Sequence, residues 1–215
     1  MAARFAKWRA VIAIGENRPS RAFIEANAHA LARYAVLRQE AGIVPIVDPE
    51  TAMDGGHSMP ACPITTEAAL RALFAWLAEQ GVALEALILK PNMILPGSAS
   101  PERPTPAAAA EFTRSELRRV VPAAVPGIAF LSGGQSGELA SARLNAMNAS
   151  PSPNATAPRK LTFSFARAIQ QPALELWAGR DANKQRPQAA LLQRTRRNRA
   201  AREGRYSAAT ETSGS

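Results

Sequence analysis

The stretch from Gly42 to Lys90 carries the pattern that decides the fold. It opens with GIVPIV (Gly42–Val47), continues through periodic apolar residues that end at Gly81, and closes with ALILK (Ala86–Lys90). Short continuous apolar runs predict buried strands, and apolar residues spaced three or four apart predict an amphipathic helix. The stretch therefore predicts two buried parallel strands joined by a helix.

The same alternation continues on both sides of this unit. Three more apolar runs are expected to be strands: Arg9–Ile14, Gly127–Leu131 and Leu161–Phe165. Helices are expected at Ser20–Glu40, from Thr65 or Thr66 to Gly81, at Thr105–Val121, at Glu138–Ala149 and at Ala166–Trp177. An α/β chain of about five βα units leaves two architectures, an open doubly wound sheet or part of a (β/α)8 barrel. The sequence lacks the glycine-rich motifs of nucleotide-binding open sheets, which favours the barrel slightly.

The pattern changes near residue 179. We expect residues 1–178 to form the βα unit, and residues 179–215 to form a basic C-terminal helix followed by a disordered tail. Within the first part, Ala149–Lys160 is rich in Pro, Ser and Ala and is expected to be a loop.

Composition limits the class of protein. The chain has 215 residues, a net charge of +9 and one cysteine, Cys62, so an internal disulfide is impossible and a reducing, cytoplasmic location fits best. No apolar run reaches the length of a membrane span, about 20 residues.

Only four of the 26 basic residues are lysines. Because arginine cannot lose its proton at working pH, a lysine kept in such a chain suggests chemistry that needs an amine.

Polar residues follow the predicted strands where catalytic groups of βα folds gather. They are Asp48 and Glu50 after the second strand, Lys90 after the third, Ser132, Gly133, Gly134 and Ser136 after the fourth, and Ser164 and Arg167 at the fifth. Lys7 and Arg9 lie at the start of the first. Taken singly, each is more often a turn or surface residue. Their joint occurrence at successive strand ends favours a site.

These residue types suit one chemistry. A lysine ending an apolar strand is desolvated, so we expect its pKa to fall and its neutral amine to attack a carbonyl. A neighbouring carboxyl group can transfer the protons of such a reaction. The Ser-Gly-Gly turn before a helix exposes N–H groups that suit a phosphate, and Arg167 adds a cation.

Six motifs resemble one family. In order they are FAKWR (Phe5–Arg9), GIVPIVDPE (Gly42–Glu50), LILKPNM (Leu87–Met93), VPGIAFLSGGQS (Val125–Ser136), LNAMN (Leu144–Asn148) and LTFSFARA (Leu161–Ala168). Their order and spacing are similar to those of class I (Schiff-base) fructose-bisphosphate aldolases. The resemblance implies a (β/α)8 TIM barrel, a phosphorylated sugar substrate, no cofactor, no metal and a homotetramer, with no nucleic acid or membrane as partner.

The resemblance also implies residue roles. Lys90 matches the lysine that forms the imine, Glu50 matches the second acid of the family's Glu-Pro-Glu, and Lys7 matches a lysine that supports proton transfer. Arg9 matches a contact to the distant phosphate. The C1 phosphate would be held by Ser132, Gly133, Gly134, Ser164 and Arg167.

The sequence departs from the family pattern at three residues. Asp48 replaces a glutamate that handles protons, and Phe165 and Ala166 replace the usual Tyr and Gly. The family's first three strands would lie before Met1. These observations predict a truncated gene product, a partial sequence or a degenerate copy of the family, with two open sheet edges and part of the active site missing.

Two alternatives remain at this stage. The arginine run Arg194, Arg196, Arg197, Arg199, Arg202 and Arg205 could neutralise nucleic-acid phosphates, although no nucleic-acid motif accompanies it. Another Schiff-base aldolase, of the transaldolase or deoxyribose-phosphate type, would share the barrel and the lysine.

Overall fold

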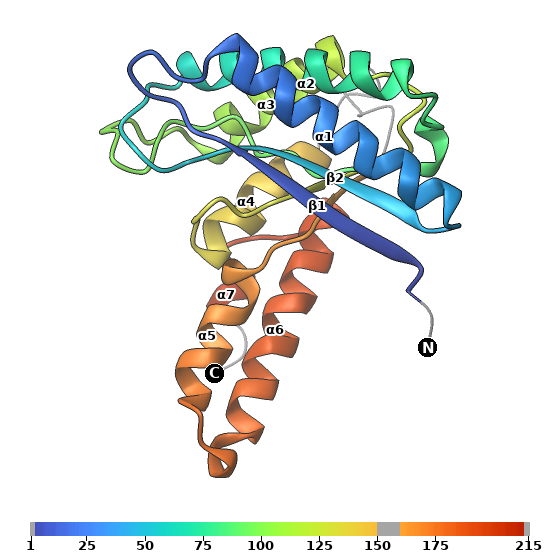
Figure 1. The fold of residues 1–215 in the computed structure, drawn as a ribbon. Coiled ribbons are helices and arrows are strands. Elements are labelled where there is room, and N and C mark those ends of the chain that lie inside the picture. Colours follow the sequence, from blue (N-terminus) through green and yellow to red (C-terminus); the bar gives the residue numbers. More distant parts are fainter. Residues whose placement is uncertain (1–2, 150–159, 213–215) are drawn as a thin grey trace.

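Five parallel strands form the centre of the molecule. The computed structural model describes residues 3–149 and 160–212. The strands are β1 (Phe5–Ile12), β2 (Val44–Thr51), β3 (Ile88–Leu89), β4 (Gly127–Phe130) and β5 (Lys160–Phe163). They pair in the order of the chain, β1-β2-β3-β4-β5 (Figure 1). A doubly wound sheet reverses its strand order at a switch point, so this unbroken order is that of a barrel segment. The predicted fold class is confirmed.

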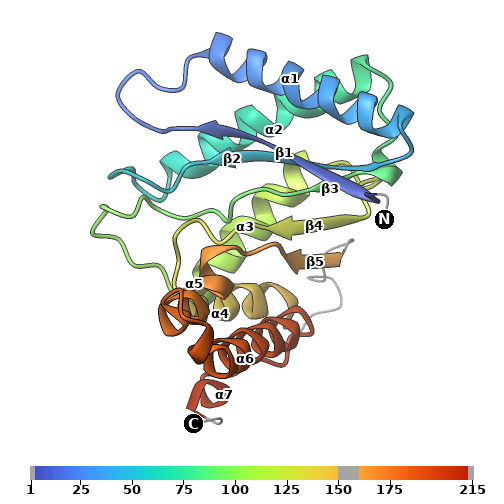
Figure 2. The ribbon, with the colours of Figure 1, turned by 60° about the horizontal axis from the view of Figure 1, so that its bottom comes forward.

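Helices follow the strands around the sheet (Figure 2). They are α1 (Arg21–Glu40), α2 (Ala61–Glu79), α3 (Pro106–Val120), α4 (Gly137–Asn148), α5 (Arg167–Trp177), α6 (Gln185–Arg202) and α7 (Ala209–Thr212), with 3-10 turns at Leu84–Ala86 and Asp181–Asn183. Helices α5 and α6 form a hairpin that projects away from the sheet (Figure 1). None of the helices in the described residues is long and apolar enough to cross a bilayer.

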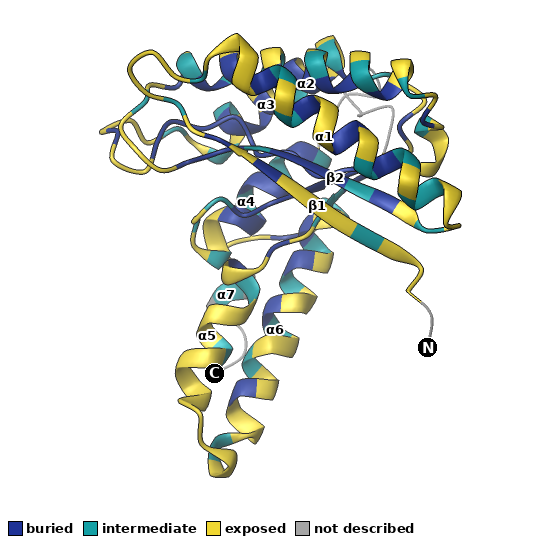
Figure 3. Cartoon of the chain, viewed as in Figure 1, coloured by how far each residue is buried: buried dark blue, intermediate teal, exposed yellow. Residues whose placement is uncertain are grey.

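The inner strands of the sheet are more deeply buried than the edge strand β1 (Figure 3). On the helix side Val47, Leu89 and Ile128 are completely buried and belong to one apolar core. The residues of β1 that point the other way, Lys7 and Arg9, are exposed. Because successive residues of a strand alternate between faces, the polar residues next to Val47 and Leu89 lie on the uncovered face.

Several boundaries differ from those expected. β1 starts at Phe5, four residues before the predicted start, because FAKWR pairs along its length with β2. β2 likewise continues to Thr51 through the same ladder. α2 begins at Ala61, before the predicted caps. Thr66 does not cap it but is buried and bonds to Thr51 in the core.

The C-terminal tail is more ordered than expected. Residues 209–212 of the predicted disordered tail form α7. The carboxylate of Glu211 pairs with Arg194 and Arg197 at 2.7 Å each, which ties α7 to α6. The expected loop around residues 150–159 and the last residues, 213–215, lie outside the described residues. The division of the chain near residue 178 stays a prediction.

Candidate active site

A lysine and an aspartate meet at the end of the central strands. Val47 of β2 pairs with Leu89 of β3, so Asp48 and Lys90 lie level with each other on the uncovered face. The backbone N–H of Lys90 donates to the carbonyl oxygen of Val47 over 2.8 Å. Nζ of Lys90 donates to Oδ2 of Asp48, also over 2.8 Å. The register of β2 and β3 therefore creates this pair.

The pair is buried, although it lies on the uncovered face. The side chain of Asp48 is 0% exposed and that of Lys90 is 10% exposed. Lysine and aspartate are rarely buried unless they are paired, and these two satisfy that rule. Oδ1 of Asp48 is buried without a hydrogen-bond partner among the described residues. Asp48 therefore keeps one acceptor atom unused.

A second amine approaches from β1. Nζ of Lys7 lies 3.6 Å from the same Oδ2 atom of Asp48, and its side chain is 42% exposed. Lys7 thus forms the outer side of a cluster in which two amines share one carboxylate oxygen.

One step further along β2, Glu50 pairs with Arg9. Nη1 of Arg9 donates to Oε2 of Glu50 over 3.2 Å, and this pair is more open to solvent than the first. The five predicted residues of β1, β2 and β3 therefore form two adjacent ion-pair groups.

The Ser-Gly-Gly turn follows β4. Ser132 is buried, and Gly133 and Gly134 have φ of +54° and +79°. A Cβ atom on Gly133 would lie 2.8 Å from Cγ of Met53, so glycine is required there by both backbone conformation and space. The turn leads into α4, where the Ser136 hydroxyl caps the helix by accepting from the N–H of Leu139.

Arg167 lies beside this turn. It is the first residue of α5, and its Nη2 atom is 3.7 Å from the point that a Cβ of Gly134 would occupy. Both residues line an open cavity of about 530 Å³ between α4, α5 and α6. Ser164 follows β5, is exposed, and donates its backbone N–H to Phe130. The residues predicted for the C1 phosphate thus gather at the ends of β4 and β5, whereas Arg9, predicted for the distant phosphate, lies on β1.

The backbone connects these two groups. The N–H of Leu131, which precedes Ser132, donates to the carbonyl of Pro91, which follows Lys90, over 3.2 Å. Of the two residues that depart from the family at β5, Phe165 is buried and stacks on Phe163 at 5.6 Å. Ala166 has φ of −99°, which is accessible to any residue.

Sequence interpretation missed a buried polar network next to Lys90. Asn92 is 1% exposed, and its amide bonds to the N–H of Thr51 and the hydroxyl of Thr66. The signal in the sequence is the asparagine of LKPNM, a polar residue in an apolar stretch.

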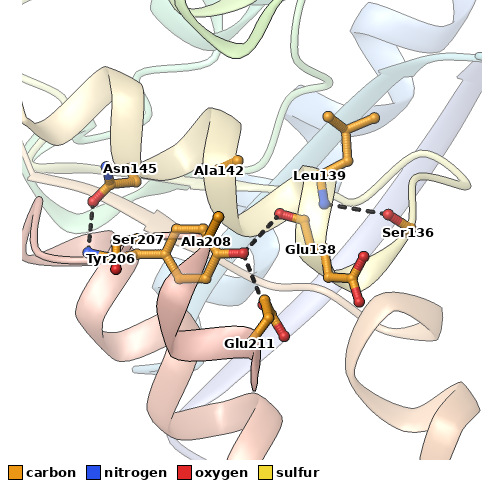
Figure 4. Close-up of a pocket in the computed structure, with 9 residues that line it drawn as sticks. All are labelled: Ser136, Glu138, Leu139, Ala142, Asn145, Tyr206, Ser207, Ala208 and Glu211. Atoms are coloured by element: carbon orange, nitrogen blue, oxygen red, sulfur yellow. Dashed lines mark hydrogen bonds between the residues drawn. The ribbon is translucent and has the colours of Figure 1, made fainter. Parts of the chain in front are cut away.

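A further cavity lies between α4 and the C-terminal residues (Figure 4). It measures about 540 Å³ and is lined by α4, by residues 206–208 and by Glu211; of the polar residues predicted after the strands, it includes Ser136. Burial, and then the neighbouring Glu211, raise the pKa of Tyr206 to about 12. Tyr206 donates its hydroxyl to Glu211 over 2.7 Å and therefore helps to fix the C-terminal segment.

The C-terminal arginines do not share one exposed face. Arg194 is 6% exposed and donates to Glu211 and Ser141, and Arg197 also pairs with Glu211. Arg199 and Arg205 pair with Glu203. Much of this charge is thus compensated within the chain.

The family model "Fructose-bisphosphate aldolase class-I" matches residues 1–215 of the chain. The chain belongs to this family. Fructose-bisphosphate aldolase 5, cytosolic, of Arabidopsis thaliana is 50% identical over 204 residues, which are 95% of this chain and 56% of that protein. The cytoplasmic isozyme 1 of Pisum sativum is 48% identical over 98% of this chain and 58% of its own length.

A solved aldolase shares the fold. The fructose-bisphosphate aldolase of Plasmodium falciparum, crystallised with TRAP and a small-molecule inhibitor, superposes with a TM-score of 0.90. It is 43% identical over 95% of this chain and 58% of its own chain. The strands described here therefore match part of an aldolase barrel, and the chain spans somewhat more than half the length of these relatives.

Proposed function

We propose that this chain carries out the reversible aldol cleavage of fructose 1,6-bisphosphate to dihydroxyacetone phosphate and glyceraldehyde 3-phosphate. Lys90 is the imine-forming residue. The observation that carries the proposal is the buried contact of 2.8 Å between Nζ of Lys90 and Oδ2 of Asp48. It supports the proposal because an amine and a carboxylate lie in hydrogen-bond contact at the carboxyl end of a barrel strand, where a carboxyl group can carry protons.

The reaction begins with proton transfer. Only the neutral amine of Lys90 can attack a ketone, and Oδ2 of Asp48, 2.8 Å from Nζ, is in position to take its extra proton. The free amine then attacks the ketone carbon, and a proton passes from the attacking nitrogen to the ketone oxygen, which becomes a hydroxyl group. Asp48 returns a proton to that hydroxyl, water leaves, and a protonated imine remains.

The imine then accepts the electrons of the broken bond. As the bond between C3 and C4 of the sugar breaks, its electron pair moves to the imine nitrogen and gives an enamine. The proton of the C4 hydroxyl goes to a carboxylate, for which Glu50 is the second candidate beside Asp48. Protonation of the enamine and hydrolysis release dihydroxyacetone phosphate and restore Lys90. Lys7, 3.6 Å from Asp48, supports these transfers.

The second group of residues holds phosphate. The N–H groups of the Ser132–Gly134 turn, the Ser164 hydroxyl and the Arg167 guanidinium suit a phosphate on C1. Arg9 is proposed to contact the more distant phosphate. Because Arg9 is paired with Glu50 in the structure, that contact requires Glu50 to share or release the guanidinium.

The substrate class, the compartment and the oligomeric state are inferred from the family. A sugar phosphate is the substrate class that family membership implies. The Arabidopsis and pea relatives are named cytosolic and cytoplasmic, which supports the same compartment here. We further propose a homotetramer, as the sequence resemblance implies.

The test is product formation from fructose 1,6-bisphosphate, with fructose 1-phosphate as second substrate. Lys90→Arg keeps a cation beside Asp48 but cannot form an imine, so it should abolish cleavage. Lys184→Arg, at an exposed lysine of the helical hairpin, should leave it unchanged. Cleavage that survives Lys90→Arg would refute the proposal. Preference for the monophosphate would instead locate the specificity at C1.

A further inference from the structure

Asn92 uses both ends of its side-chain amide. It is buried two residues beyond Lys90. Its Oδ1 atom accepts from the backbone N–H of Thr51 over 3.1 Å. Its Nδ2 atom donates to the hydroxyl of Thr66 over 3.2 Å and to the carbonyl of Met93 over 3.0 Å.

The side chain of Asn92 joins the end of β2 to the segment after β3, where the two strands no longer form backbone hydrogen bonds with each other. β2 and β3 pair only at Ile46–Ile88 and Val47–Leu89, whereas β2 runs on to Thr51. Two hydrogen bonds therefore bracket the segment between these strands. On one side the N–H of Lys90 bonds to Val47, and on the other the amide of Asn92 bonds to Thr51.

The catalytic carboxylates lie inside that bracket. Asp48 and Glu50 are both between Val47 and Thr51, on the segment that the two bonds hold against residues 90–92. If the outer bond is removed, the end of β2 is fixed to β3 only through Val47. The distance between Asp48 and Lys90 would then depend on the Val47–Lys90 bond, on the ion pair and on the ladder that still joins β2 to β1.

A second layer fixes Asn92 itself. The Thr66 hydroxyl accepts from Asn92 and donates to the hydroxyl of Thr51 over 3.2 Å. The Sγ atom of Cys62 lies 3.7 Å from Nδ2. A residue at position 92 must therefore supply a donor and an acceptor at once, which an apolar residue cannot do.

We propose that Asn92 is a positioning residue that holds Asp48 at the distance from Lys90 needed for imine formation. This inference rests on the proposed function. A purely structural role predicts loss of stability without a selective effect on the amine, so the test must separate the two.

The test compares two buried polar groups in the full chain. Asn92→Leu removes the bracket. Thr113→Val is the matched control, because Thr113 is also 1% exposed and its hydroxyl accepts from the N–H of Ile94 on the same segment. Thr66→Val removes only one partner of Asn92 and serves if Asn92→Leu does not fold.

The readout is borohydride trapping with dihydroxyacetone phosphate, followed over its concentration. Asn92→Leu should lower the maximal trapping rate at Lys90 at least about tenfold, with a change in half-saturating concentration below about threefold. The maximal trapping rate of Thr66→Val should lie between those of Asn92→Leu and the unaltered chain. Thr113→Val should have the same rate as the unaltered chain. If Asn92→Leu and Thr113→Val have similar melting temperatures and lose the maximal trapping rate equally, the proposal is overturned.

A second readout separates this proposal from the proposed function. If the unaltered chain is not trapped, the proposed function fails, and acetylation by acetic anhydride still reports on Lys90. Lys184, exposed in the same molecule, is the internal reference. The ratio of Lys90 to Lys184 acetylation should rise at least about threefold in Asn92→Leu. An unchanged ratio would overturn the positioning role.

Discussion

Oδ2 of Asp48 lies 2.8 Å from Nζ of Lys90, in a site where the aspartate is fully buried. Aldolase relatives have a glutamate at this position according to the sequence resemblance. Here the shorter side chain still reaches the lysine, because the strand register puts the two residues level with each other. The loss of one methylene is thus compatible with a direct contact.

Replacing Asp48 by asparagine should uncouple the lysine from its proton carrier. Asp48→Asn keeps the size of the side chain but cannot accept and return a proton. We expect imine formation to fall by about a hundredfold or more, the usual contribution of a positioned acid or base. Rapid-quench trapping measures this rate. Wild-type trapping in Asp48→Asn would contradict the role of this carboxylate.

Arg167 should affect binding more than chemistry. Arg167→Ala removes a cation beside the Ser-Gly-Gly turn, and a charged hydrogen bond contributes about 1.5–3 kcal/mol. The half-saturating concentration of dihydroxyacetone phosphate should therefore rise by about ten- to a hundredfold. Arg186→Ala, at an exposed arginine of α6, is the control. An equal effect of both variants would refute a specific phosphate contact.

Glu116 should make stability depend on pH. This residue of α3 is 1% exposed, and burial, followed by the charge of Glu67, raises the pKa of its carboxyl group above 4.5. Glu116 is therefore harder to ionise in the folded chain than in the unfolded chain. The free energy of unfolding falls as pH rises above 4.5, and the fall is complete once pH exceeds the raised pKa.

Glu116→Gln should remove that cost. We expect a melting temperature a few degrees above that of the unaltered chain at pH 7, and no gain at pH 4. Glu111→Gln, at an exposed residue of the same helix, should change neither value. The melting temperature of Glu116→Gln minus that of the unaltered chain is the quantity to compare. A smaller difference at pH 7 than at pH 4 would contradict a raised pKa for Glu116.

Glu211 should show the opposite pH dependence. Burial opposes its ionisation, but hydrogen bonds from Arg194 and Tyr206 outweigh burial and lower the pKa of its carboxyl group below 4.5. The contribution of Glu211 to the free energy of unfolding is full at pH values above 4.5. It is lost as pH falls through the lowered pKa. Glu211→Gln should thus reduce the melting temperature at pH 7 and matter progressively less in acid. A constant difference across pH would exclude the ion pairs as its cause.

Much of the architecture could be predicted from the sequence. The five strands were found because each is a short apolar run between helical patterns, and Lys90 stood out because it ends such a run. The boundaries of β1 were missed because FAKWR contains two cations, whose strand conformation depends on pairing with β2. The hydrogen bonds of Asn92 cannot be predicted from the sequence, since Thr51 and Thr66 come together only through tertiary contacts. The ordered α7 depends in the same way on Arg194 and Arg197.

Lys90 alone should condense with a ketose phosphate. The chain has four lysines, so reduction with borohydride in dihydroxyacetone phosphate, followed by peptide mapping, can assign the adduct without ambiguity. We expect a single adduct on the peptide that contains Lys90, and none on those with Lys7, Lys160 or Lys184. An adduct on another lysine, or none on a chain whose circular dichroism shows the α/β fold, would contradict the assignment.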